Sequence, residues 1–143
     1  MDAAFLKLTP AQILALTIYG EARGESTEGK IAVGSVILER ARRGGWYGKT
    51  IPEVCLKKWQ FSCFNENDPN YRKLLHIAEN WDEEIISNMA LNDCWGIALG
   101  LISGNIDPNV TATHYKVTTC DAYWAKEMTK VASIGHHEFF IEA

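Results

Sequence analysis

The feature that most constrains the fold of this sequence is a change of hydrophobic pattern near residue 103. Before it, apolar residues recur every three to four positions, the period of amphipathic helices. After it, the segments 110–117 and 136–143 are rich in β-branched and aromatic residues in rough alternation, which is typical of strands. The sequence therefore predicts a mostly helical α+β fold with a small C-terminal β-hairpin. A chain of 143 residues fits one domain, 1–143.

The helix boundaries are marked by capping residues and glycines. Thr9, Pro10 and Gln12 form a capping box with Pro at the first helical position. Gly44 ends the second helical pattern, and Asn, Asp and Pro accumulate in a loop at 59–70. Helices are predicted at about 10–24, 27–43, 50–58, 70–80 and 84–103, with one more short helix at 121–132.

The charge and hydropathy of the chain exclude several classes of partner. A net charge of -4 argues against nucleic acid, because phosphate binding needs a clustered basic surface. No stretch approaches the ~18 unbroken apolar residues of a membrane span. The N-terminal 20 residues have an acid at position 2 and are interrupted by Pro10 and Gln12, so they do not resemble an export signal. We expect a monomer with no stable membrane association.

The segment 14–26, LALTIYGEARGES, places a carboxylate on the apolar side of a helix. Glu21 follows Thr17 by four residues and Leu14 by seven, so it continues the inward-facing stripe. A buried Glu is costly unless it is paired or protonated, and a protonated carboxyl is what a general acid requires. Gly20 leaves room for a large ligand. The plainer alternative is a solvated Glu at a helix end.

Other candidate groups have weaker patterns. Glu25 and Glu28 suit the start of the second helix, where acids interact favourably with the helix dipole. Cys63 with His114 or His136 is a possible Cys–His nucleophile pair, but no local motif supports it. The four cysteines form no CxxC pair and no metal-ligand spacing, so no metal or cofactor is predicted. Reduced thiols are expected, with one or two disulfides as the alternative in an oxidising compartment.

Five ordered boxes closely resemble the spore cortex-lytic enzyme type of cell wall hydrolase. They are YGEARGES with the helix after it, WQFSCF, ALGLISGNIDP, ATHYKV and KVASIGHHEFF, the last matching a closing I-G-x-H-x-F strand. The boxes span about residues 12 to 141. The resemblance implies a lysozyme-like, lytic-transglycosylase-like domain whose partner is the glycan strand of peptidoglycan.

The resemblance also implies a chemistry. The first Glu of the box, the family's catalytic acid, is Glu21 here. The resemblance implies cleavage of the β-1,4 bond between N-acetylmuramic acid and N-acetylglucosamine by a lytic transglycosylase. Such an enzyme leaves a 1,6-anhydro sugar and needs no cofactor. The alternatives are a hydrolytic muramidase assisted by Glu25 or another acid, and an inactive glycan-binding relative. Substrate-binding residues are expected at Gln60, Phe61, Ser62, His114 and Tyr115.

The architecture resembles that of a bacteriophage endolysin. Neither a signal peptide nor an N-terminal peptidoglycan-binding module is recognised in the sequence. The expectation is therefore synthesis in the host cytoplasm and action on the cell wall after membrane permeabilisation, in cell lysis. A prophage-derived or bacterial cytoplasmic protein is the alternative.

Overall fold

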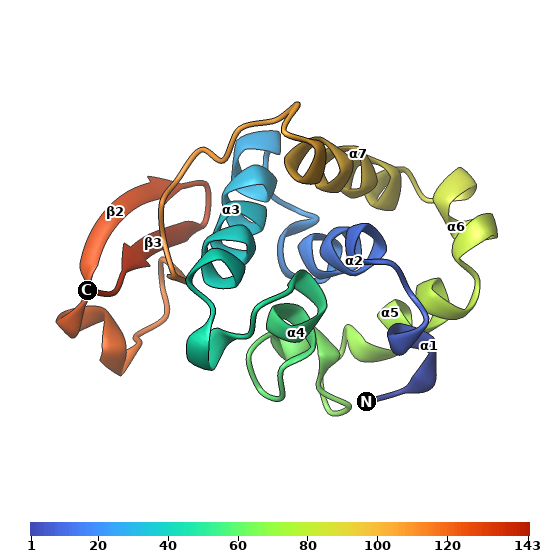
Figure 1. The fold of residues 1–143 in the computed structure, drawn as a ribbon, viewed down its shortest axis with the longest axis horizontal. Coiled ribbons are helices and arrows are strands. Elements are labelled where there is room, and N and C mark those ends of the chain that lie inside the picture. The colour runs from blue at the N-terminus through green and yellow to red at the C-terminus, as the bar shows by residue number, and fades with distance from the viewer.

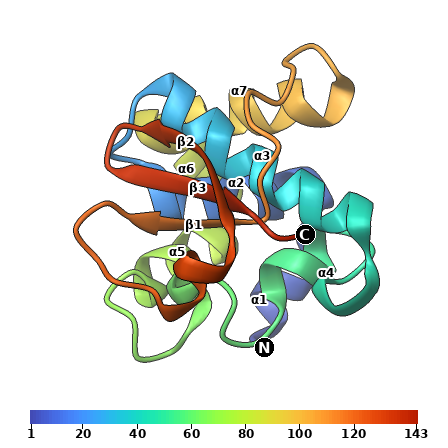
Figure 2. The same cartoon turned by 90° about the vertical axis from the view of Figure 1, so that its left-hand side faces the viewer.

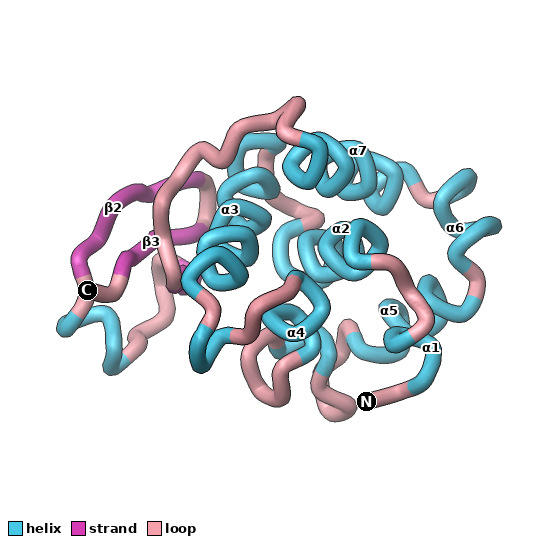
Figure 3. Tube along the Cα trace, in the orientation of Figure 1, coloured by secondary structure: helices cyan, strands magenta, loops and turns pink.

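Helix α2 (Pro10–Ala22) lies at the centre of the helical part of the molecule, as Figures 1 and 3 show. The other helices are α1 (Ala3–Leu6), α3 (Thr27–Arg43), α4 (Ile51–Leu56), α5 (Tyr71–Glu79), α6 (Trp81–Ser87) and α7 (Met89–Ser103). In this computed structural model, which describes residues 1–143, α2 packs against α3, α4 and α7. Every residue from Ile13 to Tyr19 is buried, as expected for a helix that is apolar on all sides.

The predicted helix starts are confirmed by their caps. Thr9 Oγ1 accepts a hydrogen bond from the Gln12 N–H at 3.2 Å, and Gln12 Oε1 accepts one from the Thr9 N–H at 2.8 Å. Ser26 caps α3 through the Gly29 N–H at 3.2 Å. Because these caps satisfy N–H groups that have no partner within the helix, α2 and α3 begin where the sequence predicted.

The segment 84–103 was predicted as one helix, but α6 and α7 divide it at Asn88. The Asn88 side chain accepts a hydrogen bond from the Leu91 N–H at 3.1 Å, which starts α7, and donates one to the Tyr19 hydroxyl at 3.3 Å. No single helix is long and apolar enough to span a bilayer. Taken together, α6 and α7 reach that length and composition but meet at a bend of 104°.

Three antiparallel strands follow the helices and form the sheet β1 (His114–Val117), β3 (His137–Ile141) and β2 (Thr129–Ile134), in that order. Figure 2 shows β3 in the middle. The two strands expected within 110–117 and 136–143 are confirmed and pair as β1 and β3. They do not form the hairpin, because β2 lies between them in the sequence; the hairpin is β2 with β3. The prediction of a short helix at 121–132 was wrong. Only Tyr123–Glu127 form a 3-10 turn, because the residues that follow pair with β3 to form β2.

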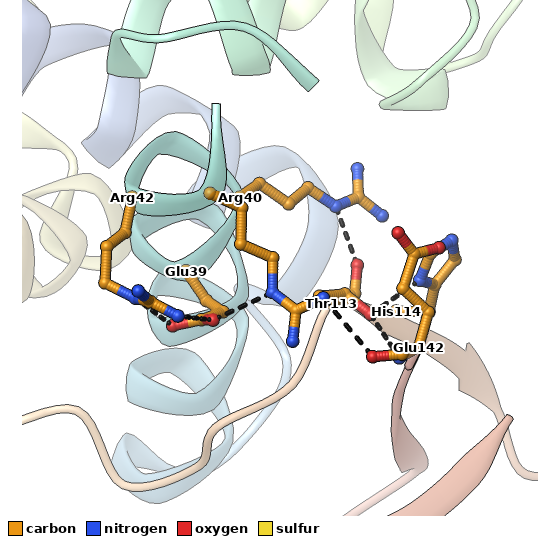
Figure 4. Close-up of polar contacts among 7 residues, drawn as sticks. Glu39, Arg40, Arg42, Thr113, His114 and Glu142 are labelled. Carbon is orange, nitrogen blue, oxygen red and sulfur yellow. Dashed lines mark hydrogen bonds and ion pairs between the residues drawn. The ribbon is translucent and has the colours of Figure 1, made fainter. Parts of the chain in front are cut away.

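A buried arginine fixes the sheet on α3. Arg40, only 7% exposed, donates from Nε to the carbonyl oxygen of Thr113 at 2.7 Å, as Figure 4 shows. Its guanidinium lies 5.4 Å from the ring centroids of both Tyr47 and Phe61. Burial lowers the pKa of Arg40. Arg40 thus holds the start of β1, which follows Thr113, against α3.

Candidate active site

Glu21 lies in the last turn of α2 and meets the sheet there. The Tyr115 hydroxyl, on β1, donates a hydrogen bond of 2.5 Å to Oε1 of Glu21. Leu14 and Thr17, which share the helical face of Glu21, are both fully buried, whereas Glu21 is half-buried. The expectation that Glu21 continues the inward stripe is therefore confirmed, and its partner is a hydroxyl from a strand.

Gly20 makes space for the protein itself and not for a ligand, in contrast to the sequence expectation. A Cβ at Gly20 would lie 2.7 Å from Cys63 Sγ and 3.1 Å from Leu74 Cδ1. The absence of a side chain therefore lets Cys63 pack against the end of α2, close to Glu21. Burial, together with the Glu21 charge, raises the pKa of the Cys63 thiol well above its usual value. Such a thiol is a poor nucleophile.

The pleat of β1 separates two of the predicted site residues. Tyr115 faces Glu21, whereas the His114 ring packs against Trp124, with ring centroids 5.0 Å apart, and against Tyr47 at 6.3 Å. Successive side chains of a strand point to opposite faces, so His114 and Tyr115 do not share a site. The pocket lined by His114 also includes Arg43, Gly44, Trp46, Tyr47 and Glu142.

The three predicted residues of the loop after α4 differ in accessibility. Phe61 is 2% exposed and belongs to the core beneath Arg40, so its ring has no free face for a sugar. Gln60 is half-buried and Ser62 is exposed. Trp59, just before them, is 65% exposed and has a positive φ of 69°, a costly conformation for a bulky residue.

His137 and Glu25 adjoin the Glu21 site. The sequence offered Glu25 only as the assisting acid of the hydrolytic alternative, and it gave His137 no role. The His137 ring is 5.1 Å from the Tyr115 ring and nearly perpendicular to it, at 76°. Its Nδ1 lies 3.5 Å from Oε1 of Glu25. Burial lowers the pKa of His137, while the charges of Glu25 and Glu21 oppose that shift. The signal that points to His137 is the histidine of the closing I-G-x-H-x-F box.

The arrangement suits proton transfer by one carboxyl group. Because Tyr115 donates to Oε1 of Glu21, a proton on this carboxyl is expected on Oε2. Oε2 is then the atom that can give a proton to a leaving group and take one back. No group of three or more His, Cys, Asp and Glu side chains is arranged to hold a metal ion.

Comparisons with known proteins agree with this architecture. The sequence profile of the cell wall hydrolase family matches residues 24–140, a stretch that begins beyond Glu21. The catalytic domain of the germination-specific lytic transglycosylase SleB from Bacillus anthracis is similar in structure, with a TM-score of 0.69 and 24% identity over 92% of this chain and 93% of that chain. No curated protein matches significantly. The predicted fold class is confirmed.

Proposed function

This chain belongs to the cell wall hydrolase family, as the five boxes predicted, and on that basis we propose that it is a lytic transglycosylase with Glu21 as its catalytic acid and base. Its substrate would be the glycan strand of peptidoglycan, cut between N-acetylmuramic acid and N-acetylglucosamine. The structurally similar SleB is a lytic transglycosylase, which supports this choice, as does the shared fold.

The proposed reaction needs one carboxyl group that acts twice. Oε2 of Glu21 would protonate the glycosidic oxygen while the bond from that oxygen to C1 breaks, through an oxocarbenium-like state. The Glu21 carboxylate would then accept the proton of the muramic C6 hydroxyl as that oxygen bonds to C1. Glu21 ends protonated again, no water is consumed, and the product is a 1,6-anhydro sugar.

The observation that favours this mechanism over hydrolysis with a second acid is the state of Glu25. Its Oε1 accepts the His136 N–H at 2.9 Å, and its Oε2 contacts His136 Nδ1 at 2.7 Å. The Glu25 side chain is only 8% exposed. Glycosidases that form a covalent intermediate or activate water use two free carboxyl groups on either side of the bond. Glu25, with both oxygens engaged, does not supply the second.

Of the predicted substrate-binding residues, we propose that Gln60, Ser62 and Tyr115 contact the glycan. Gln60 and Ser62 lie in the loop whose Cys63 packs against the end of α2, beside Glu21. Tyr115 reaches Glu21 itself. Phe61 is in the core and His114 is on the opposite face of β1, so neither is proposed to touch the sugar at the cleaved bond.

Digestion of purified peptidoglycan followed by mass spectrometry of the fragments tests the proposal. Muramic ends one water lighter than a hydrolysis product support it, and a Glu21→Gln variant should release none. Fragments with reducing ends would show a muramidase instead, and no fragments from the unaltered protein would show an inactive relative. Glu28→Gln, which changes an exposed acid nearby, is the matched control and should cut normally.

The biological setting is proposed from the sequence alone. We propose a monomer made in the cytoplasm that reaches the wall once the membrane is permeable, as an endolysin does. Expression inside bacteria should leave a culture intact until a membrane-permeabilising agent is added, after which turbidity should fall. Lysis of the culture without the agent would refute this setting. So would the absence of lysis with the agent, if the purified protein still cuts peptidoglycan.

A further inference from the structure

The turn between β2 and β3 binds the loop that follows α2 through one carboxylate. Glu25 accepts from the backbone N–H of His136 and contacts its ring nitrogen, at 2.9 and 2.7 Å. The turn is shaped for this contact. Gly135 has a φ of +58°, and a Cβ there would lie 2.5 Å from Oε1 of Glu25. Residues 111 positions apart in the chain are thus joined beside the proposed acid.

His137 connects the contact between Glu25 and the β2–β3 turn to Tyr115, the hydrogen-bond partner of Glu21. It is 6% exposed, and its buried Nδ1 has no hydrogen-bond partner and lies 3.5 Å from Oε1 of Glu25. The edge-to-face contact of its ring with Tyr115, at 5.1 Å, is a favoured aromatic geometry. The Tyr115 hydroxyl in turn donates to Glu21. A continuous series of contacts therefore runs from Glu25 to Glu21.

Glu25 is equipped to stay ionised in this position. Burial alone would raise its pKa, but the hydrogen bonds from His136 and the charges of both histidines bring that pKa below its usual value. An ionised carboxylate at neutral pH holds its donors firmly and has no proton to give. An ionised Glu25 is therefore suited to hold the β2–β3 turn in place.

We infer that Glu25 and His137 are positioning residues for the proposed acid: Glu25 holds the β2–β3 turn against the end of α2, and His137 holds the Tyr115 ring so that its hydroxyl stays on Glu21. The inference rests on the proposed role of Glu21. It assigns Glu25 to the support of the acid and not to the reaction, and it explains why a turn far along the chain meets α2 here.

A double-mutant cycle on peptidoglycan cleavage tests this inference. Tyr115→Phe removes the hydroxyl and Glu25→Ala removes the anchor, and each should lower kcat on the order of tenfold or more with little change in KM. If Glu25 acts through Tyr115, the double variant should be no worse than the worse single variant. Losses that multiply would overturn the inference. Glu28→Ala, an exposed acid three residues on, is the matched control.

Two further variants at His137 keep the inference testable if Glu25→Ala does not fold. His137→Ala removes the ring that supports Tyr115 and should reduce kcat as Glu25→Ala does. His137→Phe keeps an aromatic ring at the same place, so it should recover most of the lost rate. Equal losses for both variants would show that packing against Tyr115 is not what His137 provides.

A measurement without substrate separates failure of this inference from failure of the proposed function. The Tyr115 hydroxyl proton, held on a carboxylate, should exchange slowly with water and give its own NMR signal, identified by its loss in Tyr115→Phe. Glu25→Ala and His137→Ala should weaken that signal even if the protein cuts no glycan. An unchanged signal in both folded variants would overturn the inference.

Discussion

The Tyr115 hydroxyl and the Glu21 carboxylate, 94 residues apart in the chain, form a hydrogen bond of 2.5 Å between a strand and the end of a helix. Burial and the Glu21 charge raise the pKa of Tyr115 well above its ordinary value, so the hydroxyl keeps its proton. Tyr115 is therefore a permanent donor, and it directs the proton of Glu21 to the other oxygen.

Removing this hydroxyl should reduce activity and leave the fold intact. Tyr115→Phe keeps the ring that packs on His137 and Phe139 but leaves Oε1 of Glu21 without its donor. A lost hydrogen bond to a charged group is worth about 1.5–3 kcal/mol, which corresponds to a fall in kcat/KM of roughly 10- to 100-fold. The measurement is release of soluble glycan. Tyr123→Phe, at a side chain 90% exposed, should have no effect. Full activity in Tyr115→Phe would show that the donor is dispensable.

Adding one methyl group at Gly20 should destabilise the protein. The Gly20→Ala methyl would lie within 2.8 Å of both Cys63 Sγ and Cys63 Cβ, and Cys63 is fully buried. Such overpacking costs about 1–3 kcal/mol in the free energy of unfolding, which denaturant titration measures. Gly24→Ala, where no atom lies within 4 Å, should be neutral or slightly stabilising. Equal stability of the two variants would contradict the packing described at Gly20.

Mild acid should lower the stability of the folded state. Burial lowers the pKa of His114 and of His137 below the ordinary 6.5, so the unfolded chain takes up protons first as the pH falls. Their contribution is complete above about pH 6.5 and is lost as the pH falls toward their folded-state pKa. The thermal midpoint should therefore decrease below about pH 6.5, and less steeply in His137→Gln. A midpoint that rises on acidification would refute the prediction.

Thiol reagents should label one cysteine of the native protein. Cys120 is exposed, whereas the other three are buried, and burial raises the pKa of Cys55 to about 12 and of Cys94 to about 11. One thiol per chain is expected to react in native buffer, and all four thiols in denaturant. Cys120→Ser should abolish native labelling, and activity should survive treatment. Rapid reaction at a second thiol would contradict the buried positions.

The helices were predictable because their ends are specified locally. The bounds of α3, Thr27–Arg43, match the sequence prediction, since Ser26 caps one end and Gly44, with a φ of +67°, ends the other. Strand β2 was not predictable in this way. Its residues Thr129 to Ile134 have weak alternation and become a strand by pairing with β3, a contact that local pattern does not encode.

The site was predictable only in part for a similar reason. Glu21 follows from helical periodicity, because its face is set by Leu14 and Thr17. His114 and Tyr115 are adjacent in a strand, so at most one of them can face Glu21, but the identity of that one depends on how the sheet packs. Phe61 is buried in the core, and the Arg40 guanidinium, from 21 positions earlier, lies 5.4 Å from its ring centroid. Neither contact is visible from the local pattern of the loop.

The order β1-β3-β2 has a consequence for partially folded molecules. Strand β3 is the only hydrogen-bonded neighbour that β1 has in the sheet, so β1 and its Tyr115 depend on β3 for their alignment. A chain whose helices have formed while the sheet is still detached holds Glu21 without the hydroxyl that orients it. If Glu21 is the acid, such an intermediate should be at least as slow as Tyr115→Phe, so the main rise in activity during refolding should follow docking of the sheet and not formation of the helices.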